Sequence, residues 1–98
     1  METKELPFKC HLFVCVNHRD NGRKSCGDCG GETLKSAIKK ATKERGWHGV
    51  VRVSGSGCLG LCDSGPNVII YPQKIWFAHV VENNIPQIIE TIERLINA

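Results

Sequence analysis

The alternation and clustering of apolar residues along the chain predict four strands. Three short runs rich in β-branched and aromatic residues predict the first three: "HLFVCV" over 11–16, "GVVRVS" over 49–54 and "NVIIY" over 67–71. The third run does not alternate, which predicts a strand that is buried on both faces. A tight turn at 72–74 leads into a fourth run, "IWFAHVV" over 75–81, and so short a connection predicts that the last two strands pair antiparallel.

Two further segments have the spacing of amphipathic helices. Over residues 32–46, lysines separate apolar positions that recur every three or four residues: Leu34, Ala37, Ile38 and Ala41. Gly46 is placed to end this helix. The C-terminal segment carries a second apolar stripe made of Ile85, Ile88, Ile89, Ile92, Leu95 and Ile96. Pro86 fits the first turn of that helix, where its missing N–H leaves no bond unmade.

The order of these elements, β-α-β-β-β-α, predicts one α/β domain over residues 1–98, with about residues 1–9 as a flexible N-terminal tail. The first β-α-β unit is expected to be a right-handed parallel crossover, and the remainder a hairpin with a covering helix. The result is a small four-stranded mixed sheet with two flanking helices in three layers. This arrangement resembles a thioredoxin fold without its middle helix.

Composition and charge exclude several classes of function. The formal charge of +3 comes without a basic stripe interleaved with aromatic residues, so nucleic-acid binding is not predicted. No apolar run approaches the roughly 20 residues that a membrane-spanning helix needs, and no membrane partner is predicted. Residues 1–9 lack the apolar stretch of a signal peptide, so we expect a cytoplasmic protein. No nucleophile–base pair, pair of carboxylates or phosphate-binding loop indicates an enzyme.

Six cysteines stand out in a chain of 98 residues: Cys10, Cys15, Cys26, Cys29, Cys58 and Cys62. Stable disulfides are uncommon in the cytoplasm, so this number points to metal ligands or catalytic thiols. Two glycine-rich loops follow the two strands of the parallel unit and must therefore leave the sheet at the same edge. That edge brings together four cysteines with the spacing C-x10-C-x31-C-x3-C, namely Cys15, Cys26, Cys58 and Cys62.

The other two cysteines are harder to place in such a site. Cys10 lies five residues before Cys15, about 16 Å along an extended strand, and the odd offset turns the two side chains to opposite faces. We therefore interpret Cys10 as a structural thiol. Cys29 follows Cys26 in "CGDC" and could substitute for Cys26 as a ligand. A C-x-x-C pair before a helix is also typical of a dithiol redox motif.

Four thiolates suit either zinc or an iron–sulfur cluster. Structural zinc sites usually take short C-x2–4-C pairs, and here only Cys58 and Cys62 form one. A two-iron cluster accepts ligands from two separate loops, and glycines leave backbone N–H groups available to its sulfur atoms. Two alternatives stay open on the residues alone. They are a zinc-stabilised interaction module and a dithiol oxidoreductase that uses Cys26 and Cys29.

Several motifs together resemble one family. "FVCVN", a basic loop that ends in "SC", then "GCLGLCDSGPNVIIYP" and "IWF" are similar to the thioredoxin-like (Shethna-type) [2Fe–2S] ferredoxins. The resemblance runs from about His11 to the final helix. It implies a one-electron carrier, not an enzyme, that serves redox partner proteins through one [2Fe–2S] cluster. The ligands implied by the resemblance are Cys15, Cys26, Cys58 and Cys62. The additional Cys29 departs from the family pattern and leaves the second ligand open.

The resemblance also bears on oligomeric state. Members of this family are commonly homodimers, which implies a homodimer here. Trp76 and Phe77 are neighbours on the fourth predicted strand and must point to opposite faces of the sheet. One of them is expected in the core and the other on an open face, where an exposed aromatic side chain suits a dimer contact.

Overall fold

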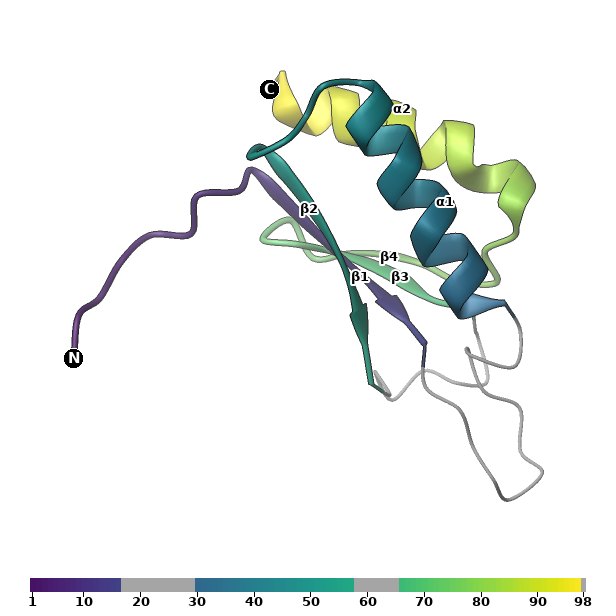
Figure 1. Cartoon of the computed structure of the whole chain (residues 1–98), viewed down its shortest axis with the longest axis horizontal. Helices are drawn as coiled ribbons and strands as arrows, with labels where there is room; N and C mark the ends of the chain where they lie inside the picture. The colour runs from purple at the N-terminus through teal and green to yellow at the C-terminus, as the bar shows by residue number, and fades with distance from the viewer. Residues whose placement is uncertain (17–29, 58–65, 98) are drawn as a thin grey trace.

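The computed structural model describes residues 1–16, 30–57 and 66–97. The predictions made for Cys26, Cys29, Cys58 and Cys62 fall outside these described residues. The element order agrees with the sequence prediction, apart from a short 3₁₀ turn before the last helix (Figure 1). The elements are β1 (Cys10–Cys15), α1 (Gly31–Glu44), β2 (Val51–Ser56), β3 (Val68–Tyr71), β4 (Ile75–Phe77), the 3₁₀ turn η2 (Glu82–Asn84) and α2 (Ile85–Ile96).

The four strands form one mixed sheet in the order β2-β1-β3-β4. β1 pairs parallel with β2 and antiparallel with β3, and β3 pairs antiparallel with β4. The predicted parallel crossover and C-terminal hairpin are both confirmed. β1 therefore lies inside the sheet with a hydrogen-bonded neighbour on each side, whereas β2 lies at one edge.

Both helices cover the same face of the sheet (Figure 1). α1 contacts α2, and both helices contact β1. One hydrophobic core fills the space between the sheet and the helices, and its most buried members include Leu12, Val14, Ile38, Val68, Ile70, Ile88 and Ile92. The three-layer expectation is wrong, since the structure has two layers. An apolar stripe shows that one side of a helix is buried, but not which face of the sheet it packs against. Here the stripes of both helices pack against the same face of the sheet and share one core.

The opposite face of the sheet carries aromatic side chains, and none of the helices in the described part of the chain covers it. We call it the open face; strand register places on it His11, Phe13, Ile69, Tyr71 and Trp76. In β3, Val68 and Ile70 are completely buried, but Tyr71 is 46% exposed. The prediction that this strand is buried on both faces is wrong. Its run of apolar residues alternates between the core and the open face.

The fourth strand is shorter than predicted. β4 ends at Phe77, four residues before the predicted end, because His79 adopts a φ of 52° and turns the chain. Val80 then enters the core, and its N–H donates to the carbonyl of Pro66 at 3.0 Å. The segment after β4 therefore packs beside the residues that precede β3.

The two helices agree closely with their predicted limits. α1 ends at Glu44, and Gly46 follows with a φ of 72°, a backbone conformation that glycine adopts without steric cost. α2 carries Pro86 in its first turn, as predicted. Across residues 1–16, 30–57 and 66–97, no helix combines the length and the apolar character that crossing a membrane requires.

Candidate metal centre

Cys15 is the one member of the predicted ligand set within the described residues. It is the last residue of β1, it pairs with Ser56 of β2, and none of its surface is exposed. The N–H of Val16 donates to the carbonyl of Ser56 at 3.0 Å, so the two parallel strands end together. The two cysteine-bearing segments consequently depart from the same edge of the sheet, as the sequence predicted.

The second cysteine-bearing segment also returns to Cys15. The N–H of Cys15 donates to the carbonyl of Asn67 at 3.3 Å, just before β3 begins. Pro66, which precedes Asn67, is held in turn by the N–H of Val80. Cys15 is therefore fixed through its backbone between the residues that come before and after segment 58–65.

Asn67 is a site residue that the sequence reasoning missed. It is 1% exposed, and its Oδ1 accepts a hydrogen bond from Nε1–H of Trp76 at 2.8 Å. A polar side chain can be buried at low cost only when it is hydrogen-bonded, and here the partner comes from β4. Asn67 thus contacts the backbone of Cys15 through its carbonyl and Trp76 through its side chain. The available signal was a lone amide in "GPNVIIYP", directly before an apolar run.

Replacing Asn67 with alanine is expected to destabilise the protein by about 1–3 kcal/mol, because the change removes the buried partner of the Trp76 indole. For a domain of this size, each kcal/mol lowers the melting temperature by roughly 4–8 °C. Thermal unfolding followed by circular dichroism measures the effect. Asn83 is exposed in η2, so Asn83→Ala is a matched control that should melt like the parent. Equal losses in the two variants would contradict a structural role for Asn67.

Cys10 occupies a different environment from Cys15. It belongs to the hydrophobic core beneath the helices, and none of its surface is exposed. Burial raises the pKa of the Cys10 thiol above its usual value, and the neighbouring Gln73 offsets part of this shift. A metal ligand must be a thiolate, so a raised pKa disfavours ligation and agrees with a structural thiol. Strand alternation places Cys15 on the opposite face, as predicted.

The edge where the parallel strands end carries one sulfur atom within the described residues, that of Cys15. Among the described residues, no group of three or more cysteine, histidine, aspartate or glutamate side chains could hold a metal ion. Cys15 is a buried cysteine at the end of the parallel strand pair, a position that suits a ligand of an iron–sulfur cluster enclosed at the edge of a sheet.

Known proteins with similar sequences and structures are electron carriers. A 2Fe-2S ferredoxin from Clostridium pasteurianum is 31% identical over 86 residues, which cover 85% of this chain and 83% of that protein. A 2Fe-2S ferredoxin from Aquifex aeolicus (strain VF5) is 28% identical over 96 residues, covering 88% and 86% of the two chains. The crystal structure of the wild-type thioredoxin-like [2Fe-2S] ferredoxin from Aquifex aeolicus aligns with a TM-score of 0.77 and 27% identity, covering 84% of this chain and 82% of that one. No protein-family model matches the sequence.

Proposed function

The chain belongs to the thioredoxin-like [2Fe–2S] ferredoxins, and we propose that Cys15, Cys26, Cys58 and Cys62 are the ligands of its cluster. Ferredoxins carry electrons and are not enzymes. The bound cluster supplies the redox chemistry by taking up and releasing one electron at a time. The protein is accordingly a one-electron carrier that serves redox partner proteins, and its own residues hold and enclose the cluster.

The observation that supports this ligand set most directly is the position of Cys15 between Ser56 and Asn67. Cys58 follows Ser56 by two residues, a span of at most about 7 Å of extended chain. Cys62 precedes Asn67 by five residues in the same connection. Because this connection joins the strands on either side of β1, both of its cysteines are within reach of the end of β1.

The second ligand is the open choice between two neighbouring thiols. Cys29 directly precedes Gly30, the N-cap of α1, whereas Cys26 lies four residues before that cap. The longer tether gives Cys26 more reach toward the edge where Cys15 lies. We therefore assign the second ligand to Cys26 and treat Cys29 as a spare thiol.

Serine variants of these two residues test the assignment. Cys26→Ser is expected to lose most of the visible sulfide-to-iron absorption and of the EPR signal after one-electron reduction, because a hard oxygen ligand replaces a thiolate. Cys29→Ser, its matched control, is expected to keep both signals at the level of the parent. The variants are purified without oxygen and compared per mole of protein. The reverse result would move the second ligand to Cys29.

The open face supports a proposal about assembly, namely that two copies of the chain pack against each other through it. The rings of His11 and Phe13 stack at 4.1 Å, and the ring of Tyr71 lies edge-on to Phe13 at 6.1 Å. Burial, and to a smaller extent the charge of Arg52, lower the pKa of His11 and favour its neutral form. Trp76 is also 47% exposed on this face. Arg52 pairs with His11 at the β2 edge of this face, and the aromatic side chains further along it are of the kind that is typical of subunit interfaces.

A buried charge should disrupt this dimer. Tyr71→Glu is expected to weaken self-association by at least about 100-fold, because the interface would have to bury an unpaired carboxylate. Sedimentation equilibrium measures the effect. Ser36→Glu adds the same charge to an exposed position on α1, away from the open face, and should leave association unchanged. If Ser36→Glu dissociates the protein and Tyr71→Glu does not, the interface is on the helical side instead.

We also propose a cytoplasmic location and protein partners rather than a membrane or nucleic acid. A reducing compartment keeps cysteine thiols available as ligands. The mild formal charge of +3 does not support binding to nucleic acid.

A further inference from the structure

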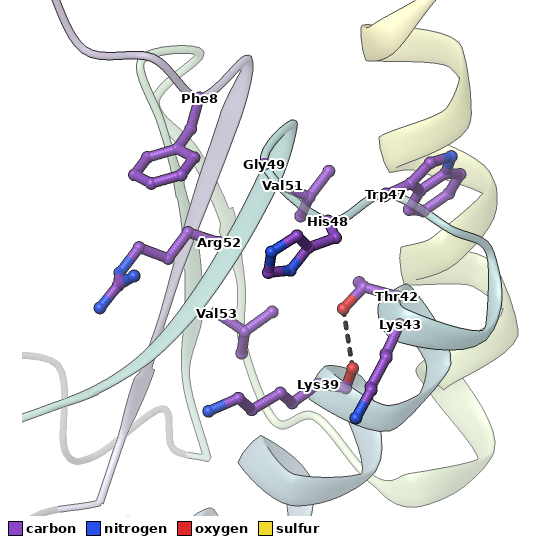
Figure 2. Close-up of a pocket in the computed structure, with 10 residues that line it drawn as sticks. All are labelled: Phe8, Lys39, Thr42, Lys43, Trp47, His48, Gly49, Val51, Arg52 and Val53. Carbon is purple, nitrogen blue, oxygen red and sulfur yellow. Dashed lines mark hydrogen bonds between the residues drawn. The ribbon is translucent and has the colours of Figure 1, made fainter.

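A second surface with a distinct chemistry lies at the outer edge of β2. It is a cavity of about 480 Å³ between that edge and the C-terminal half of α1 (Figure 2). We call it the β2-edge groove and define it by Phe8, Lys39, Lys43, Trp47, His48 and Arg52. None of the described residues that line it is acidic. The groove therefore presents cations around an apolar floor.

The backbone of β2 is available along this groove. β2 is the terminal strand in the order β2-β1-β3-β4. The carbonyls of Val50 and Ser56 accept hydrogen bonds from β1, and in a parallel pair the residues that bond to one neighbour alternate along the strand. The N–H and C=O groups of Val53 and Gly55 consequently point away from β1, toward the outer edge of the sheet. In the described part of the chain, no strand pairs with this edge.

Positive charge flanks the edge on both sides. Figure 2 shows Arg52 on one side of β2 and Lys39 and Lys43, from α1, on the other. The guanidinium of Arg52 lies over the ring of Phe8, with its central carbon 5.8 Å from the ring centroid. Among the described residues, the ion pairs engage other cations, such as Lys35 with Glu32, and none neutralises these three. The groove thus keeps its charge available to a ligand.

We propose that the β2-edge groove binds an acidic, extended segment of a partner protein, which adds to β2 as a fifth strand. Successive side chains of an added strand point to opposite faces of the sheet. Neighbouring carboxylates would therefore reach Arg52 on one face and Lys39 or Lys43 on the other. That the partner is a redox protein rests on the electron-carrier function, whereas the binding needs only the groove.

The direction of β2 connects this surface to the metal centre. The strand runs from Val51, in the groove, to Ser56, which is paired with Cys15. A segment bound along the edge would hold its parent protein beside the sheet edge where the cluster ligands gather. Attraction between opposite charges also speeds the encounter of two proteins, and it weakens as salt is added.

The test is isothermal titration of the cluster-loaded protein with three blocked peptides. They are octaglutamate, octaserine, and octaglutamate with an N-methyl group on every residue, which has no backbone N–H on either edge to donate to a neighbouring strand. Visible absorbance confirms the cluster content of every sample, so loss of the cluster is not mistaken for loss of binding. Octaglutamate is expected to bind, more weakly at high salt, and the other two peptides to bind at least about tenfold more weakly.

Glutamine variants locate the binding site. Arg52→Gln should weaken octaglutamate binding roughly two- to fivefold, and the double variant Lys39→Gln/Lys43→Gln more strongly, since each exposed charge pair contributes modestly. Lys40→Gln is the matched control, because Lys40 is exposed on the same helix but does not line the groove. An equal loss with Lys40→Gln, or equal binding of the N-methylated peptide, would overturn the proposal.

Lysines beside a strand edge have another known effect, which is to prevent edges of two molecules from pairing. If that is their function here, octaglutamate does not bind and the Lys39→Gln/Lys43→Gln variant self-associates with its cluster intact. That result would also overturn the proposal. It would leave the cysteine ligand set untouched, because both readouts are independent of electron transfer.

Discussion

Replacing Cys15 with alanine is expected to give a colourless protein that shows no EPR signal after one-electron reduction. Alanine offers no ligand atom, and Cys15 is the proposed ligand that the sheet itself supplies. Its own N–H donates to the carbonyl of Asn67, and the N–H of the next residue, Val16, donates to the carbonyl of Ser56, so the backbone at this position is fixed. Iron and acid-labile sulfide per chain should fall by at least about tenfold, measured on protein purified without oxygen.

Cys10→Ala is the matched control for this prediction. It removes a thiol from the same strand, but from the core side beneath the helices. The variant should keep its colour and its EPR signal and lose only about 1 kcal/mol of stability, through a small cavity. A colourless Cys10→Ala protein beside a coloured Cys15→Ala protein would reverse the assignment of ligand and structural thiol.

The largest loss of stability is expected from Leu12→Ala. Leu12 lies in the middle of β1, between Val53 of β2 and Ile70 of β3, and none of its surface is exposed. Truncating such a residue removes apolar contacts and leaves a cavity, at a cost of about 2–5 kcal/mol. Native domains are stable by only about 5–15 kcal/mol, so this is a large fraction of the total.

Thermal unfolding of the cluster-loaded protein measures this loss, with an expected fall in melting temperature of about 10 °C or more. Leu6→Ala makes the same chemical change at a position that is 75% exposed, and should leave the melting temperature unchanged. A similar fall in both variants would show that the N-terminal segment contributes to the core. No change in either would contradict the central position of Leu12.

Much of the fold could be predicted because local patterns determine it. The stripe over 32–46 needs only neighbouring residues to indicate a helix, and the short turn at 72–74 makes the two flanking strands antiparallel neighbours. The sidedness of the helices could not be predicted, because a stripe does not record which face of the sheet it meets. Ile69 and Tyr71 were wrongly predicted to be buried for the same reason. The residue type alone does not distinguish an apolar side chain on an open face from one in the core.

In the candidate site, too, one residue could be predicted from the sequence and another could not. The position of Cys15 followed from topology, because parallel strands end at one edge. The role of Asn67 depends on an N–H from β1 and an indole from β4, which are distant in sequence. These groups meet only in the folded chain, so no local sequence pattern could predict the role of Asn67.

The interior position of β1 bears on how firmly the proposed ligand Cys15 is held. A strand with a partner on each side opens only with much of the sheet, whereas chain ends and edges open at a lower free energy. A ligand at the end of such a strand stays in position through small local openings. As the proposed ligand on this strand, Cys15 is therefore expected to keep its place until β1 separates from its two neighbours.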